Sequence, residues 1–473
     1  MMSGSRPVLA AWALTALFAL AVAASVYRIP IQVSDSLEIM ETVERSPSVA
    51  AAFGMGLRAS TTMLRPMRQA QTKALLGLAH RLGDRYNLVF RGFHAATAAV
   101  LILLFAAAAR PRTWPDVAAL AFALTVLTGL HTFAGMVREA YPINHFLLVS
   151  LYGLAVMLLA QSRGGLLVDV AACAVFALAA LTLESGLLVW VVAAAAYLSG
   201  LRGLSRGALV AMTVLGVAYV GLRVGYLGMS PSSLGDRQTG FGLHVLSVVD
   251  ERARFGSAPL PLYAYTVIAS AMTVLFSQPS VGVWTALQAW QAERFTPVYV
   301  IEIGTSLAAT LLLAWHLGGR TTPDGPRRWR SPVPLVALAV LVANAVQSYA
   351  YAKNEIMSVS GVFYALLTYA AAREAAARLS RRGQGWVLVP GLVAVVVVSG
   401  AWGFRSLGLQ YKLQRAAYVA RSEWVEDMPP YRAVQAPGDG FRLAPRLRQE
   451  ALLRGRTNPF MLPLWTAAYW GEE

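Results

Sequence analysis

Twenty consecutive residues near the start of the chain, 8–27, read VLAAWALTALFALAVAASVY and contain no charged side chain. A helix of about 20 apolar residues crosses the roughly 30 Å hydrocarbon core of a bilayer, so this run predicts a membrane span. The chain then becomes polar, and residues 33–38 read VSDSLE. The opening of the chain therefore predicts a membrane helix that delivers the carboxylates of Asp35 and Glu38 to water.

The composition of the whole chain agrees with this start. Of 473 residues, 57% are hydrophobic and 14% are charged, whereas soluble domains carry about a quarter charged residues. Apolar runs of similar length recur, without the period-2 alternation of a membrane barrel. We predict an all-α polytopic membrane protein of about eleven transmembrane helices, at 8–27, 94–109, 116–133, 143–160, 166–181, 186–198, 208–227, 298–317, 333–349, 356–371 and 387–403. We interpret 263–276 as re-entrant or as one of two short crossings.

Arginine accounts for almost all of the net charge of +16, because Lys73, Lys353 and Lys412 are the only lysines. These arginines cluster at the ends of apolar runs, which favours positive-inside topology over nucleic-acid binding. With a cytoplasmic N-terminus, three short connections fall inside and carry Arg110, Arg112, Arg163, Arg202 and Arg206. We therefore predict an N-in/C-out protein without a nucleic-acid partner. The lysine-poor, alanine- and arginine-rich usage indicates the cytoplasmic (inner) membrane of a bacterium.

The chain divides into a transmembrane domain, 1–403, and a short extracytoplasmic tail, 404–473. The first outer loop, 28–93, predicts a short surface helix around Glu38 and a second helix that begins at Pro66. Apolar side chains form one face of that second helix, with Arg68 and Lys73 off it, so we expect it to lie in the headgroup plane. A polar outer loop follows at 229–262. We expect the first apolar run to be an uncleaved anchor rather than a signal peptide.

Several polar side chains fall on the predicted outer face. Asp35 and Glu38 fit either a D-x-x-E cap of a surface helix or a carboxylate that takes a proton from an acceptor. Arg138 and Glu139 form either a local ion pair or an anion site, because a guanidinium donates two parallel hydrogen bonds to phosphate. Glu184 lies between two apolar runs, where a carboxylate is either an interfacial helix cap or a functional group.

Other polar residues support weaker interpretations. His131 and His145 flank the Arg138–Glu139 pair, but their spacing matches no metal signature, so a divalent metal remains open and no cofactor is certain. Asn344, Gln347, Lys353 and Glu355 mark a later outward helix end, either as ordinary interhelical hydrogen bonds or as part of a lipid-phosphate pocket. The lone cysteine, Cys173, excludes a disulfide framework. No nucleotide-binding glycine loop is present.

The order of short motifs resembles the GT-C superfamily of membrane glycosyltransferases, most closely its protein O-mannosyltransferase-like branch. The resemblance covers roughly 8–198 and departs from the family in two places: the second acid of the paired motif moves from position 36 to Glu38, and Leu183 replaces the lysine of "KE-x-G". The motifs that carry it are Asp35-Ser36 after the first span, Leu64-Arg65-Pro66-Met67, Gly83, Phe90-Arg91-Gly92-Phe93-His94, Arg138-Glu139-Ala140-Tyr141-Pro142 and Leu183-Glu184-Ser185-Gly186.

The resemblance implies a helical bundle with in-plane outer helices and a polyprenyl-phosphate sugar as donor. It implies that Asp35 is the general base on an acceptor hydroxyl, with Glu38 as a second acid, and that the reaction inverts the anomeric carbon. It further implies that the donor phosphate or substrate contacts Arg65, His94, Arg138, Glu139 and Glu184. Two other functions stay open: a transporter or flippase of a lipid or glycan, and a non-catalytic membrane protein of the same fold.

Overall fold

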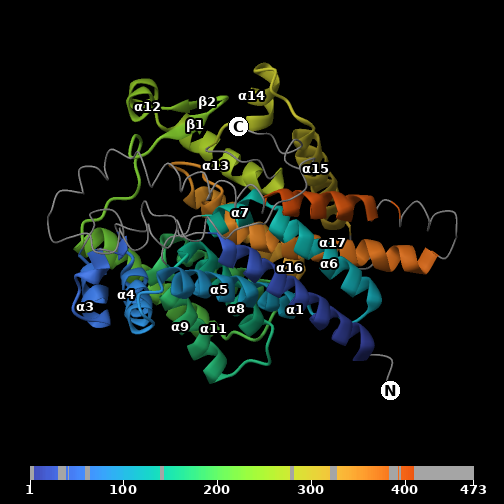
Figure 1. Cartoon of the computed structure of the whole chain (residues 1–473), viewed down its shortest axis with the longest axis horizontal. Helices are drawn as coiled ribbons and strands as arrows, with labels where there is room; N and C mark the ends of the chain where they lie inside the picture. Colours follow the sequence, from blue (N-terminus) through green and yellow to red (C-terminus); the bar gives the residue numbers. More distant parts are fainter. Residues whose placement is uncertain are drawn as a thin grey trace.

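We describe the protein from a computed structural model, which describes residues 5–29, 39–40, 42–58, 64–138, 143–276, 282–319, 328–382, 393 and 396–409. Helices form most of it (Figure 1). The helices of the first half are α1 (Ser5–Arg28), α3 (Val49–Gly56), α4 (Pro66–Arg81), α5 (Tyr86–Ala109), α6 (Trp114–Gly129), α7 (His131–Arg138), α8 (His145–Ala160), α9 (Leu166–Thr182), η1 (Glu184–Leu187), α10 (Leu188–Leu198), α11 (Arg206–Val220) and the π-helical η2 (Gly221–Tyr226).

The second half of the chain contains the only strands among the described residues. Its elements are β1 (Thr239–Phe241), β2 (His244–Leu246), α12 (Val248–Phe255), α13 (Leu260–Leu275), α14 (Thr285–Gln291), α15 (Pro297–Gly318), η3 (Arg328–Arg330), α16 (Pro332–Gln347), η4 (Glu355–Met357) and α17 (Ser358–Arg382). Residues 396–409 are also helical.

Five of the described helical segments are long and apolar enough to cross a membrane: Arg6–Arg28, Tyr86–Ala109, Arg206–Tyr226, Pro297–Gly318 and Glu355–Leu379. A sixth is the α6–α7 pair, which is bent by 61° at Leu130. Further apolar helices are shorter, including α8, α9 and α16. The apolar helices indicate a multi-pass membrane protein; the number of eleven spans and their direction stay predictions.

The break between α6 and α7 interrupts the predicted span 116–133. A capping box of Thr113 and Asp116 starts α6, and the helix ends at Gly129, next to the extended residue Leu130. Gly129 packs directly on the ring of Trp402, where an added Cβ would lie 2.8 Å from the indole. The chain resumes as α7 in a new direction, so residues expected in an outer connection are helical and buried as far as Val137.

The polar outer loop 229–262 contains a small folded unit rather than an open loop. Strands β1 and β2 pair antiparallel, with Phe241 opposite His244, so the described chain is not purely α-helical as predicted. Phe241 packs on Phe255 of α12 and on Tyr265 of α13, with ring centroids 5.0 and 4.8 Å away. Figure 1 shows this hairpin, α12 and α14 gathered on one side of the bundle, beyond α13.

The C-terminal end of helix α13 is held by a side chain of α15. The Thr310 hydroxyl, midway along α15, donates to the Leu275 carbonyl at the C-terminal end of α13 at 2.8 Å and so satisfies one of its terminal acceptors. The chain is next described at Gly282, whose carbonyl accepts from Tyr265 on the second turn of α13 and whose backbone packs on Gly240 of β1. Tyr265 of α13 and Gly282 thus both contact the same hairpin.

Candidate functional site

An ion pair between Arg65 and Glu184 joins residues 119 positions apart in the chain. Arg65 Nη2 donates to Glu184 Oε2 at 2.8 Å, and Arg65 Nε donates to the same oxygen at 3.0 Å. The two side chains are 15% and 19% exposed. Arg65 Nε also donates to Glu184 Oε1 at 3.3 Å, so the guanidinium engages both carboxylate oxygens and links the start of α4 to the α9–α10 turn.

Local backbone geometry puts Glu184 at this place. Helix α9 ends at Thr182, Leu183 is extended, and η1 begins at Glu184, where a carboxylate faces the positive end of a helix. The turn is so tight that a Cβ on Gly186 would lie 2.1 Å from the Ala179 carbonyl oxygen, and only glycine fits. Gln347 at the end of α16 donates to the Glu184 carbonyl at 2.8 Å, which holds the turn from the other side.

A second guanidinium approaches the same carboxylate from α11. Arg223 Nη2 lies 3.7 Å from Glu184 Oε1, and the Arg223 side chain is 17% exposed. Arg223 stands on η2, where the helix widens to π-helical hydrogen bonding; such widened turns recur at functional sites. Tyr219, one turn earlier, is buried at 6% exposure. Glu184 is therefore shared by two arginines, one before it and one after it in the chain.

Helix α4 supplies Arg65 at its N-cap and orients its polar side inward. Pro66 occupies the first turn, where its missing N–H costs no hydrogen bond. Arg68, Gln69 and Thr72 are buried, whereas much of the predicted apolar face points outward, with Leu78 and Leu82 each 45% exposed. The helix begins at Pro66, as predicted. Its buried side is not purely polar, because Ala70, Leu76 and Ala79 are buried as well.

Two buried histidines lie behind this pair. His145, at the first position of α8, is fully buried, and Arg65 and Arg68 both act on it electrostatically. His94 and Arg91 are also fully buried, and Arg91 Nη1 lies 3.2 Å from His94 Nδ1. His94 was expected at the start of a span, but α5 begins at Tyr86, so His94 lies two turns inside the helix.

Four of the predicted site residues are not placed by these contacts. Asp35, Glu38 and Glu139 lie outside the described residues, and Arg138 is described only as the last residue of α7. The remaining three, Arg65, His94 and Glu184, are described, and the structure brings Arg65 and Glu184 together. Within the described ranges no three His, Cys, Asp or Glu side chains lie close enough to hold a metal ion.

His131 belongs to a different buried cluster, away from Arg65. Its Nε2 lies 3.4 Å from Glu302 Oε1 on α15, and its Nδ1 lies 3.3 Å from Arg405 Nη2. Arg405 Nη1 donates to the Glu302 carbonyl at 2.9 Å and to the Ser306 hydroxyl at 2.8 Å. All of these side chains are nearly inaccessible to solvent. The interpretation that His131 and His145 share a metal therefore lacks geometric support, since they sit in separate networks.

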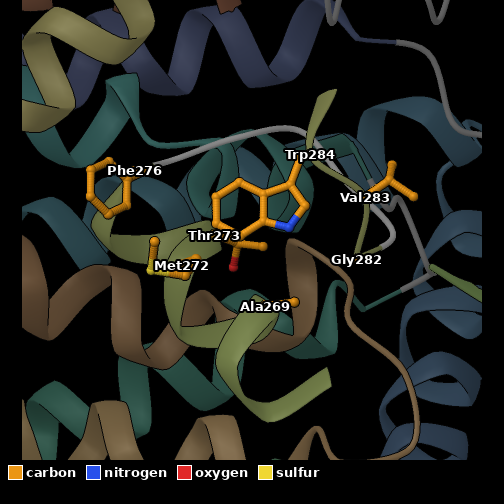
Figure 2. A pocket seen from close by; sticks show the side chains of 7 residues that line it. All are labelled: Ala269, Met272, Thr273, Phe276, Gly282, Val283 and Trp284. Carbon is orange, nitrogen blue, oxygen red and sulfur yellow. The ribbon is translucent and has the colours of Figure 1, made fainter. Parts of the chain in front are cut away.

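An apolar pocket opens beside α13, apart from both charged clusters. It is a half-open hollow lined by Ala269, Met272, Thr273, Phe276, Gly282, Val283 and Trp284. Figure 2 shows the Trp284 indole extending over Thr273 and Met272, with Phe276 at the far side. None of the lining side chains is ionisable. The pocket thus has no group that pairs with a phosphate, and it does not coincide with the Arg65–Glu184 pair.

Sequence reasoning missed Arg223, Tyr219, Arg68 and Arg405 as site candidates. A usable signal was present for Arg223 and Arg405, because each is an arginine inside or beside an otherwise apolar run, where charge is costly. No protein-family model matches the chain, and no similar curated protein or solved structure was found for it.

Proposed function

We propose that the protein is a glycosyltransferase that moves a sugar from a polyprenyl-phosphate donor to an acceptor hydroxyl on the extracytoplasmic face, with inversion and with Asp35 as general base. One observation carries the proposal: Arg65 at the start of α4 and Arg223 on η2 converge on Glu184, and η2 continues helix α11, whose apolar side chains are largely exposed. This combination provides cationic donors at the edge of an apolar surface, which is where the phosphate of a membrane lipid lies.

The chemistry of the transfer requires such donors. When the acceptor oxygen attacks the anomeric carbon, the bond from that carbon to the phosphate oxygen breaks and the negative charge collects on the departing polyprenyl phosphate. Guanidinium groups stabilise this charge with paired hydrogen bonds. Glu184 keeps Arg65 oriented before the donor arrives, so less side-chain entropy is lost on binding. In this proposal Arg138, Glu139 and His94 complete the donor site, and Glu38 is a second acid beside Asp35.

The proposal includes the N-in/C-out topology with about eleven spans in a bacterial inner membrane. Trp290, Phe295 and Tyr299 support it, because they form a chain of ring contacts just before and within the first turn of α15, and aromatic belts mark membrane interfaces. The contacts of Tyr265 and Gly282 with the same hairpin support a re-entrant α13, which leaves an even number of crossings in this region. The acceptor and any divalent metal are not specified.

Transfer of radiolabelled sugar from a polyprenyl-phosphate sugar by purified protein tests the proposal. We expect Asp35→Asn to abolish transfer while donor binding persists, because the base is lost and the phosphate contacts remain. Asp236→Asn, in the polar outer loop, is the matched control and should transfer at the wild-type rate. Undiminished transfer by Asp35→Asn would exclude Asp35 as the base, and no transfer by wild type to any hydroxyl acceptor would argue against the enzyme.

A transporter or flippase is the second candidate, favoured by the α6–α7 break and by the buried Arg405–His131–Glu302 cluster. Broken helices and intramembrane ionisable groups are common in transporters. Reconstituted vesicles separate the two functions. A flippase moves a labelled polyprenyl-phosphate sugar across the vesicle without transferring it, whereas the proposed transferase consumes the donor on one face. If the vesicles show neither flipping nor transfer, a non-catalytic protein of this fold is favoured.

A further inference from the structure

Helix α11 is covered by the rest of the protein along one narrow stripe only. Ala208, Met212 and Tyr219 are its buried residues, at spacings of four and seven. Most of the surrounding valines and leucines are exposed, with Val214 61% and Val217 67% accessible. A helix that is apolar on its outer face as well as its packed face is suited to contact with lipid. Helix α11 therefore presents a lipid-facing wall.

Arg223 continues the packed stripe at the end of this wall. It follows Tyr219 by four residues, and the π-helical turn places its guanidinium 3.7 Å from Glu184. The contact is longer than the 2.8 Å bond from Arg65 to the same carboxylate. Tyr226, three residues on, is 83% exposed. Arg223 thus lies between the exposed apolar wall of α11 and the Arg65–Glu184 pair.

We infer that Arg223 receives the anionic headgroup of a lipid that enters sideways along α11, and passes it to the Arg65 side of the cluster. The inference rests on the proposed function and adds to it an entry route and a binding residue. Charge complementarity supports the occupant: a phosphate is attracted by two guanidiniums that share one carboxylate, while its hydrocarbon chain lies against the valine-rich wall. Arg223 exchanges its 3.7 Å contact with the Glu184 carboxylate for the incoming phosphate, while Glu184 keeps its contact with Arg65.

Binding of a polyprenyl phosphate to the full-length protein in nanodiscs of zwitterionic lipid tests the inference. The neutral polyprenol of the same length and inorganic phosphate serve as separate ligands, so that chain and headgroup contributions are measured apart. We expect Arg223→Gln to weaken polyprenyl-phosphate binding roughly tenfold or more, as loss of a charge-assisted contact predicts, and to leave polyprenol binding unchanged. Arg223→Lys keeps the charge without the paired donors. Its affinity for polyprenyl phosphate should lie between those of wild type and Arg223→Gln.

Arg206→Gln is the matched control, because Arg206 begins the same helix at its opposite end. It should bind polyprenyl phosphate as wild type does. If wild type prefers the phosphate over polyprenol and Arg223→Gln keeps that preference, the entry route is wrong and the proposed function stands. If wild type shows no preference for the phosphate, the proposed donor is wrong. If inorganic phosphate competes with polyprenyl phosphate and binds as tightly, the ligand of Arg223 is a soluble anion rather than a lipid. That result would also overturn the entry route.

Discussion

At the scale of the residue, the informative side chains are those whose partners come from distant parts of the chain. Glu184 joins Arg65, Arg223 and, through its carbonyl, Gln347. Removing one member of a buried ion pair leaves the other charge without its partner, and this costs more than removing both. The pair is therefore best tested by changing its members separately and together.

We predict a clear interaction energy in the double-mutant cycle of Arg65→Met and Glu184→Met. Each single variant should lower the thermal midpoint in detergent, and the double variant should be less destabilised than the sum of the two, by about 1–3 kcal/mol. Thermal unfolding followed by fluorescence on purified protein measures this. Additive losses would show that the two side chains act independently and would contradict the bidentate pair.

We predict that Gly186→Ala disrupts the turn that carries Glu184. Its Cβ would meet backbone, the Ala179 carbonyl, which cannot move aside as a side chain can. Overpacking of this kind costs about 1–3 kcal/mol or more, so the thermal midpoint should fall. The matched control is Gly304→Ala in α15, where no atom lies within 4 Å and the helix propensity of alanine should keep stability equal or raise it. Equal behaviour of the two variants would contradict the close approach.

At the scale of the element, two polar networks hold segments that hydrophobic packing alone leaves unspecified. One is the Arg405 cluster, which connects residues 396–409 to α15 and to the first turn of α7. The other is Glu251 of α12, whose carboxylate accepts from the Thr239 N–H of β1 at 2.7 Å. In each case a charged side chain joins elements that are separate in the chain.

Arg405→Met should destabilise the protein by about 3–5 kcal/mol, because it leaves Glu302 buried without its nearby cation. The double variant Arg405→Met with Glu302→Gln should recover part of that loss. Thermal midpoints and protease resistance of the detergent-solubilised protein report the difference. An unchanged midpoint in Arg405→Met would mean that helix 396–409 is held by its apolar contacts alone, including those of Trp402.

Burial raises the pKa of Glu251 above its usual range, because the charged form loses water in the folded protein. The folded state then binds a proton more tightly than the unfolded chain. Stability contributed by this group therefore rises as pH falls through the folded pKa and levels off below the unfolded value. We predict that Glu251→Gln, which keeps an acceptor for Thr239, is as stable as wild type or more stable at neutral pH.

The advantage of Glu251→Gln should shrink in mild acid, where wild type takes up its proton. Thermal midpoints measured across this range test the sign. A variant that is less stable than wild type by the same amount at every pH would show that the charge itself is needed by β1.

At the scale of the whole molecule, the two ends of the bundle carry different structures. Figure 1 places α12, the hairpin and α14 at one side of the bundle. The arginine-rich connections link α5 to α6, α8 to α9 and α10 to α11. The N-in topology assigns the hairpin to the outside and the 161–165 connection to the inside. Because Cys173 is the only cysteine, a Cys173→Ala background makes single introduced cysteines readable.

In that background we expect His244→Cys to react with a membrane-impermeant maleimide in intact cells, and Arg163→Cys to react only after permeabilisation. His244 is an exposed residue of strand β2, and Arg163 is an exposed residue of the connection between α8 and α9. Labelling at either position therefore reports the side of the membrane and leaves the packed helices unchanged. The reverse pattern would invert the topology, and labelling of both from outside would remove at least one predicted span.

The sequence by itself determined that the chain has the composition of a membrane protein, where most of its helices lie, and which connections carry the arginines. Those properties are local, since a run of apolar residues or an arginine after a helix acts in any fold. The partners of Glu184, the buried polar residues of α4, the break at Leu130 and the contacts of 260–284 with the hairpin were decided only by tertiary structure. The Glu184 carboxylate shared by Arg65 and Arg223, or Gly129 packed against Trp402, depends on distances between segments that sequence spacing does not contain.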